Sequence, residues 1–284
     1  MKPAILLYGN CQAETLTTIA RAIPSLQSGL TFKNIAWYVN ETIDWTGARG
    51  ADFMSDIRVV WEQVDTGPVD ENRAEMRRRL PGDCQIIRFP PLWITTLWPF
   101  IGNDPRLAES KRYFWTDTIA AQLAGTDLSD DELYAEYMRI STERMPNLDR
   151  RLRLDLARWR ANDEAANLKL ADYVLEWFRK TRLFYTVAHI SAVPLYHILR
   201  SLIDGTEIIK PADRLKARLE LDVMLRHHGG DNYEMVPVHP LVAERLGLDY
   251  FDPNERHRYY GHRWTHKEYI LNYIRWAPYI GGRA

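Results

Sequence analysis

Short apolar runs alternate with helix-like segments over the first hundred residues, and this alternation constrains the fold more than any other feature of the sequence. The run 4–8 predicts a first strand, and the segment 13–23 carries Leu16, Ile19 and Ile23 at helical spacing. Further strands are predicted at 30–39, 57–64 and 84–89, with a short helix at 72–80. Such an order is typical of a parallel sheet whose strands are joined by helices.

From about residue 105 helical patterns replace the strand signals, up to residue 183. Ser129 and Glu132 form a capping box, and Thr265-His266-Lys267-Glu268 caps the last helix. Asn162-Asp163-Glu164 marks another helix start, and Ser191 resembles an N-cap. Helices are predicted at 130–138, 162–179, 192–202, 211–226, 240–246 and 266–276, and a strand-like run at 183–188. We therefore predict an α/β fold in a single domain, 1–284, with a small parallel sheet and flanking helices in 1–104 and a mainly helical portion, 105–284, packed on it.

The charges nearly cancel, since 37 Lys and Arg residues stand against 38 Asp and Glu residues, and the formal net charge is −1. Nothing supplies the basic field that nonspecific nucleic-acid binding requires, so no nucleic-acid partner is expected. The apolar runs fall far short of the roughly 18 residues that cross a bilayer, and the N-terminal run is too short for a signal peptide. We therefore predict a cytoplasmic protein without a transmembrane segment.

Cys11 and Cys84 are the two cysteines of the chain. Two cysteines do not make a disulfide framework, so both are predicted to be thiols in a reducing compartment. The spacings of His, Cys and Asp do not resemble a zinc signature, and no metal is expected. The 10 Trp, 15 Tyr and 8 Phe residues are mostly expected in the core, although such rings also line pockets for sugars and ring systems.

The segment Gly9-Asn10-Cys11-Gln12 occupies the turn after the first predicted strand, which is the usual position of a ligand site in a parallel α/β sheet. The positive end of the helix dipole should lower the pKa of Cys11 and favour the thiolate that a nucleophile needs. Backbone N–H groups around Cys11, with the Asn10 carboxamide, would donate to an oxyanion on an acyl group. A cysteine at this position is equally consistent with a small buried hydrophobic residue.

Two other interpretations of the turn are excluded by its residues. A dinucleotide site needs further glycines after Gly9, and none follows it in the turn. A phosphate-transferring loop needs an arginine six residues after Cys11, where this chain has Thr17.

A cysteine nucleophile needs a base, and His189 is the best candidate because it lies where a short apolar run precedes a capped helix. The other histidines fit plainer roles: a helix entry for His239, a helix end for His227 and His228, and a polar wall or surface for His257, His262 and His266. The acid that would orient the base remains open between Asp117, Asp231 and Asp252.

Four segments resemble the WcbI family of polysaccharide-biosynthesis enzymes, in the family's order. They are Gly9-Asn10-Cys11-Gln12 after the first strand, Phe89-Pro90-Pro91-Leu92 followed by Trp98-Pro99, Phe184-Tyr185-Thr186 ending in His189, and Val236-Pro237-Val238-His239-Pro240 with the residues that follow to Leu248. The opening turn is also similar to that of SGNH hydrolases, with Cys11 where those enzymes have a serine.

The resemblance implies a protein that binds coenzyme A and acetylates a sugar of a capsular or other surface polysaccharide. The family's cysteine would correspond to Cys11 and its downstream histidine to His189. The neighbours of that histidine are Ala188 and Ile190 here, where the family usually has Asn and Pro.

We therefore predict acyl transfer from acetyl-CoA to a sugar hydroxyl, with Cys11 as nucleophile or thioester-facing group and His189 as general base. Gly9, Asn10 and Gln12 would form the oxyanion-binding turn. Basic side chains expected near the CoA phosphates are Lys111, Arg112, Arg179, Lys180 and Arg182. An acetyl-Cys11 intermediate and direct attack of the sugar on the thioester both fit, and so do two other classes, a thiol esterase or deacetylase and a noncatalytic CoA- or glycan-binding protein.

Overall fold

The structure is a computed structural model that describes residues 2–37, 51–64, 71–109, 113–228 and 234–276. The described residues form two compact units. We call them the sheet unit, drawn from 1–92, 158–173 and 190–231, and the aromatic unit, drawn from 93–157, 174–189 and 232–284. The residues of each unit come from separate stretches of the chain, and the predicted single domain with a boundary near residue 104 stays a prediction.

The sheet unit contains a four-stranded parallel sheet in the order β2-β1-β3-β4, which confirms the predicted α/β fold. Its strands are β1 (Ala4–Gly9), β2 (Thr31–Ala36), β3 (Ile57–Gln63) and β4 (Gln85–Phe89). Gly9 pairs with Ala36 and Gln63 pairs with Phe89, at the carboxyl ends of the strands. Residues that follow or end these strands therefore lie at one edge of the sheet.

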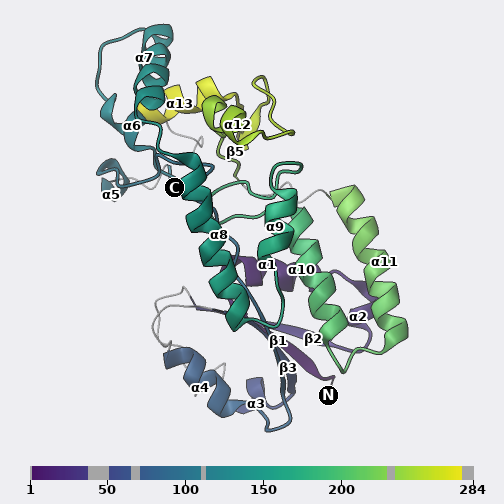
Figure 1. The fold of residues 1–284 in the computed structure, drawn as a ribbon. Helices are drawn as coiled ribbons and strands as arrows, with labels where there is room; N and C mark the ends of the chain where they lie inside the picture. Colours follow the sequence, from purple (N-terminus) through teal and green to yellow (C-terminus); the bar gives the residue numbers. More distant parts are fainter. Residues whose placement is uncertain (1, 38–50, 65–70, 110–112, 229–233, 277–284) are drawn as a thin grey trace. The chain divides into compact units, whose positions relative to one another are not determined.

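Helices cover both faces of this sheet (Figure 1). They are α1 (Cys11–Arg21), α2 (Pro24–Gln27), α3 (Ala51–Met54), α4 (Glu71–Arg79), α10 (Ala192–Gly205) and α11 (Pro211–His228). Met54 of α3 and Met76 of α4 pack with Val60 in one buried cluster. Successive side chains of a strand point to opposite faces of the sheet, so Trp61, next to Val60, points to the other face. There its Nε1 donates to Thr206 Oγ1, 2.9 Å away and just after α10.

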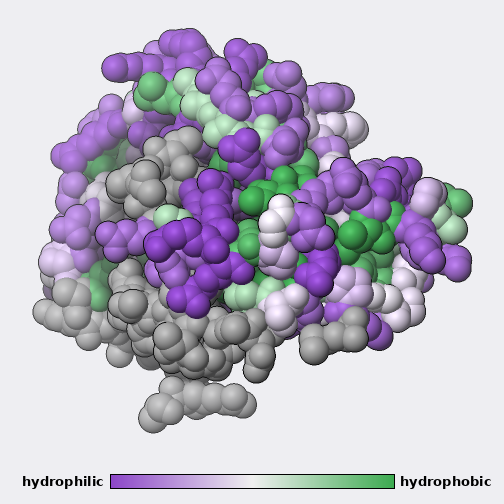
Figure 2. All heavy atoms as spheres, turned by 90° about the horizontal axis from the view of Figure 1, so that it is seen from below, coloured by the Kyte–Doolittle hydropathy of each residue, from purple (hydrophilic) through white to green (hydrophobic). Residues whose placement is uncertain are grey.

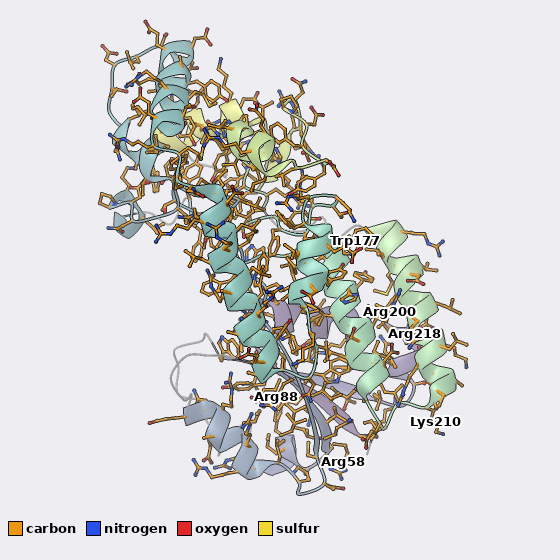
Figure 3. The ribbon with its side chains drawn as sticks, viewed as in Figure 1. Arg58, Arg88, Trp177, Arg200, Lys210 and Arg218 are labelled. Atoms are coloured by element: carbon orange, nitrogen blue, oxygen red, sulfur yellow. The ribbon has the colours of Figure 1, made fainter. Side chains whose placement is uncertain are left out.

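Two ion pairs join α10 to α11, which lie side by side (Figure 3). Arg200 of α10 pairs with Asp222, and Arg218 of α11 pairs with Asp204 at 2.5 Å. Leu219 of α11 is exposed. On the face of the molecule seen in Figure 2, hydrophobic groups lie between hydrophilic ones. These two helices belong to the half of the chain that the sequence predicted to be helical.

The aromatic unit has a core rich in tyrosine. Tyr113 stacks on Tyr259 with ring centroids 5.5 Å apart and meets Tyr273 edge-on at 5.1 Å. Its elements are α5 (Arg106–Glu109), α6 (Thr118–Gln122), α7 (Asp130–Glu143), α12 (Pro240–Leu246), the hairpin β5 (His257–Tyr259) and β6 (His262–Trp264), and α13 (His266–Ile274). The capping boxes predicted at the starts of α7 and α13 are both formed. The hairpin was not predicted.

The helix predicted at 162–179 is wrong. Helix α8 (Leu148–Ala165) continues through Asn162, and a separate helix, α9 (Ala171–Trp177), begins after it. The Asp163 carboxylate accepts hydrogen bonds from the N–H groups of Leu170 and Ala171, both at 2.9 Å. Asp163 therefore does cap a helix, but that helix is α9, which begins eight residues further along the chain.

The strand-like run predicted at 183–188 is a loop. Tyr185 N donates to His189 O at 2.9 Å, and His189 N donates back to Thr186 Oγ1 at 3.1 Å. These bonds close a tight turn that ends at His189. In the described part of the chain, no helix is long and apolar enough to cross a membrane, and no three side chains of His, Cys, Asp or Glu gather as metal ligands would.

Candidate functional site

The turn after β1 has the strand-turn-helix geometry that the sequence predicts. Asn10 is the N-cap of α1, and its Oδ1 accepts a hydrogen bond from Gln12 N at 2.9 Å. A Cβ on Gly9 would lie 2.6 Å from the Cβ of Ala13 and 2.9 Å from that of Gln63. Glycine is therefore required here by the close approach of neighbouring atoms, and the turn places Cys11 at the first position of the helix.

Gln63 fixes this turn from the end of the neighbouring strand β3. Its Oε1 accepts from Asn10 N at 2.9 Å, and its Nε2 donates to Gln12 Oε1 at 3.2 Å. Gln12 also bonds both backbone groups of Leu92, with Nε2 donating to O at 2.5 Å and Oε1 accepting from N at 3.1 Å. Gln12 and Gln63 are buried, so the side-chain amide of Gln12 is committed to holding the turn.

The role of Gln63 could not be predicted from the sequence. Gln63 lies in a run of apolar residues that predicts a buried strand, and nothing in that run marks one polar residue as a partner of a turn more than fifty residues away.

Cys11 is half-buried, and burial raises the pKa of its thiol above the ordinary value. The backbone N–H groups of Gln12 and Cys11 lower that pKa, but by less than burial raises it. The expectation of a lowered pKa is therefore wrong, because desolvation of the thiolate outweighs the helix N-terminus. Cys11 is a protonated thiol at neutral pH.

His189 belongs to the aromatic unit, whereas Cys11 belongs to the sheet unit. Its ring meets Trp115 edge-on, with centroids 5.6 Å apart. Burial lowers the pKa of His189, and the charge of Glu234 acts in the opposite direction. The imidazole is therefore neutral at neutral pH, which is the form that accepts a proton.

The basic residues predicted to bind the CoA phosphates differ in the contacts that they make within the protein. Arg182 uses both terminal nitrogens on the Glu255 carboxylate, and Arg179 donates from Nε to Leu246 O at 2.8 Å. Lys180 is exposed, with Nζ 5.0 Å from the ring centroid of Trp177, which is labelled in Figure 3. Lys111 and Arg112 lie outside the described residues.

The two described candidate acids, Asp117 and Asp252, accept hydrogen bonds from backbone N–H groups. Asp117 caps α6, and its buried carboxylate accepts from two backbone N–H groups and from Tyr137 Oη at 2.9 Å. Asp252 accepts from Asn254 N at 2.8 Å in an exposed turn. Asp231 lies outside the described residues. His239 is the helix entry that the sequence predicts, because its Nδ1 accepts from Leu241 N at 3.1 Å at the start of α12.

The aromatic unit has a small cavity of about 30 Å³ that is partly open to solvent. Rings supply much of its wall, and the imidazoles of His239 and His266 lie in it with centroids 5.5 Å apart. Other lining residues are Trp98, Phe100, Trp115, Val187, Val236 and Ile270. The high aromatic content is the one sequence signal for this cavity, and it does not indicate which rings would line it.

Comparison with known proteins identifies the family. The sequence model of the family described as polysaccharide biosynthesis enzyme WcbI matches residues 4–208. A solved structure of WcbI, described as a novel polysaccharide biosynthesis enzyme in a native form without a disulfide bond between coenzyme A and a cysteine, has a TM-score of 0.71 and 17% sequence identity. The match covers 97% of this chain and 90% of that one; at this identity it shows the fold alone. A search of curated proteins gave no match. The chain belongs to the WcbI family of polysaccharide biosynthesis enzymes.

Proposed function

We propose that this protein transfers an acyl group from a coenzyme A thioester to a sugar hydroxyl in polysaccharide biosynthesis. The observation that carries the proposal is the position of Cys11 at the start of α1, in a turn held by Gln63 and Gln12 at the carboxyl edge of a parallel sheet. Ligands of such sheets bind at that edge. A rigid turn with a thiol and helix N–H groups suits a thioester, whose carbonyl oxygen gains negative charge during transfer.

The relative supports coenzyme A as the donor. The solved WcbI structure is described by reference to a disulfide bond between coenzyme A and one of its cysteines. In this chain Cys84 immediately precedes β4 and so lies at the amino edge of the sheet, opposite to the ligand-binding edge. Cys11 is therefore the cysteine that we propose faces the CoA sulfur.

The neutral imidazole of His189 and the protonated thiol of Cys11 favour direct transfer of the acyl group from CoA to the sugar. In this route neutral His189 takes the proton of the sugar hydroxyl while its oxygen attacks the thioester carbonyl carbon. The carbon–sulfur bond then breaks, and the CoA thiolate leaves and receives the proton from His189. Asn10 Nδ2 and the N–H of Cys11 would donate to the oxyanion, since Asn10 Oδ1 already bonds Gln12 N. The raised pKa of Cys11 disfavours an acetylated Cys11 intermediate.

The phosphates of CoA need cations, and we propose Arg179 and Lys180 for this role. Both side chains are exposed, and Arg179 bonds the protein through Nε, so its terminal nitrogens remain for a phosphate. Arg182 already balances Glu255 and suits the role less well.

The proposal is tested by intact mass and thermal shift on one set of samples. Wild type, Cys11→Ala, His189→Gln and the control Cys84→Ala are incubated with CoA and with acetyl-CoA, without acceptor. We expect stabilisation of wild type and Cys84→Ala by both compounds, a smaller shift for Cys11→Ala, and no acetyl adduct. Absence of stabilisation in every sample contradicts the proposal, and release of acetate at the turnover rate identifies an esterase.

With a polysaccharide acceptor, the single variants and the double variant separate the roles of the two residues. If Cys11 and His189 serve the same step, the double variant loses no more activity than the more damaged single variant. Losses that multiply show that the two residues act in different steps.

A further inference from the structure

A buried carboxylate lies near the carboxyl end of β3, within the sheet unit. Glu62 is 1% exposed, and the next residue is Gln63, which holds the Cys11 turn. Arg77 of α4 donates to both oxygens of Glu62, from Nη2 to Oε1 at 2.7 Å and from Nε to Oε2 at 3.2 Å. Arg73, one turn earlier in α4, has its Nε 3.2 Å from Oε1. One carboxylate therefore faces two guanidinium groups.

Further contacts fix the guanidinium of Arg73. Its Nη2 donates to Gln63 O at 3.3 Å, which connects α4 to the residue that holds the Cys11 turn. Its Cζ lies 5.6 Å from the ring centroid of Tyr8 and 5.2 Å from that of Trp37. Aromatic rings attract a cation but carry no net charge, so these contacts orient Arg73 without neutralising it.

Arg88 of β4 adds a third guanidinium on the same face of the sheet. Arg88 is the register partner of Glu62, and partners on adjacent strands, about 4.8 Å apart, point to the same face. Its side chain, labelled in Figure 3, is exposed and has no carboxylate partner among the described residues. The three arginines therefore carry more positive charge than Glu62 neutralises.

This arrangement suits a phosphate group. Guanidinium groups bind phosphate oxygens through pairs of N–H bonds, and Glu62 already orients two of these groups. Arg77 is 45% exposed, and its Nη1 makes no hydrogen bond within the described part of the chain, so a ligand can reach it. Ligands of parallel sheets bind at the carboxyl edge, where Glu62 lies.

We propose that Arg73, Arg77 and Arg88, arranged around Glu62, bind a phosphate group of a substrate beside the Cys11 turn. Two substrates of the proposed reaction are sources of such a group. CoA carries several phosphates, and an acceptor that is a sugar phosphate carries one as well. The inference rests on the proposed function for the identity of these substrates, whereas the phosphate site itself follows from the arginines.

Binding of two phosphate compounds to full-length variants tests the site. Dissociation constants for CoA and for glucose 1-phosphate are measured by titration calorimetry at one physiological ionic strength, because salt screens exposed charges. Arg88→Gln removes a side chain without a carboxylate partner in the described residues, and Arg77→Gln removes one that Glu62 holds. Arg78→Gln is the control, since Arg78 follows Arg77 in α4, is 72% exposed and pairs with Glu75.

Arg88→Gln and Arg77→Gln should each weaken binding of the compound whose phosphate occupies the site by about tenfold or more, as expected for hydrogen bonds to charged groups. Arg78→Gln should leave the affinity unchanged. Thermal melting of the free proteins reports folding, and Arg88→Gln carries the test if Arg77→Gln does not fold.

The two compounds distinguish the sources of the phosphate. Weaker binding of CoA in the variants assigns the phosphate to the acyl donor. Unchanged CoA binding with weaker glucose 1-phosphate binding assigns it to the acceptor. Equal affinities of both compounds in wild type and the two site variants overturn the site, as does an equal loss in Arg78→Gln, which would show a general effect of surface charge.

Failure of the proposed function gives a different result. If CoA does not bind wild type, the proposed function fails, and glucose 1-phosphate still tests the phosphate site. If CoA binds wild type and the site variants bind both compounds as tightly, the proposed function stands and the phosphate site fails. Absence of binding of both compounds to wild type overturns both proposals.

Discussion

Gln63 Oε1 accepts a hydrogen bond from Asn10 N at 2.9 Å, so the last residue of β3 holds the turn that follows the neighbouring strand β1. The same side chain donates to Gln12, which in turn bonds Leu92. One buried glutamine thereby connects the turn that carries Cys11 to the segment after β4. The geometry at Cys11 depends on this network as much as on the turn's own sequence.

Gln63→Leu should destabilise the fold by about 1–3 kcal/mol, because it leaves Asn10 N and the Gln12 carboxamide buried without this partner. Gln85→Leu is the matched control, since Gln85 also uses both polar atoms of its side chain, on Gly205 O and Glu207 N, but is more accessible to water. Urea denaturation measures both variants. Equal losses in the two variants would contradict a special role for Gln63.

Gly9→Ala should cost about 1–3 kcal/mol of unfolding free energy, because its Cβ would lie 2.6 Å from that of Ala13. Gly29→Ala is the control, since a Cβ there meets nothing within 4 Å. That control should be neutral or slightly stabilising. Thermal and urea denaturation compare the two, and an unchanged Gly9→Ala protein would show that the turn relaxes freely.

Asp163→Ala should destabilise the protein by about 0.5–2 kcal/mol, the range measured for loss of a helix cap. The carboxylate accepts from the N–H groups of Leu170 and Ala171 at the start of α9. Glu164→Ala, a change of an exposed neighbour, should leave stability within about 0.5 kcal/mol. The far-ultraviolet circular dichroism signal and the urea midpoint are measured for both variants. Equal urea midpoints would contradict a capping role for Asp163.

Stability should fall as the pH drops below about 6.5, the ordinary pKa of an unfolded histidine. Burial lowers the pKa of His239 to about 4 and that of His266 to about 3, so the unfolded chain binds more protons than the folded one in this window. Burial raises the pKa of Asp117 to about 6, which acts in the opposite direction below that pH.

Melting temperatures between pH 7.5 and 4.5 test this dependence. Wild type should lose stability toward acid, and His266→Gln should lose less over the same range because one of the depressed groups is absent. Parallel curves would show that His266 does not titrate as its burial requires.

The Cys11 thiol should react slowly with iodoacetamide at pH 7 and faster as the pH rises above 9, because burial raises its pKa. The Cys84→Ala background isolates Cys11, and burial likewise raises the pKa of Cys84 to about 11. A labelling rate that is already at its plateau near pH 7 would establish an activated thiolate and restore the acyl-Cys11 route.

Local patterns in the sequence were sufficient for the elements of the sheet and for the capping boxes of α7 and α13. Those signals depend on residues within a few positions of one another, so they survive in any tertiary context. The position of Cys11 after the first strand follows from the same kind of signal. The family resemblance added an expected chemistry to that position.

Tertiary structure alone decided the rest, because each feature depends on partners far apart in the chain. Gln63 meets a turn of another strand, and Asp163 caps a helix that does not begin beside it. The pKa of Cys11 rises because surrounding atoms exclude water, which no local spacing encodes. The cavity joins side chains from loops and helices between residues 97 and 270, and only their packing selects which of the many aromatic rings form its wall.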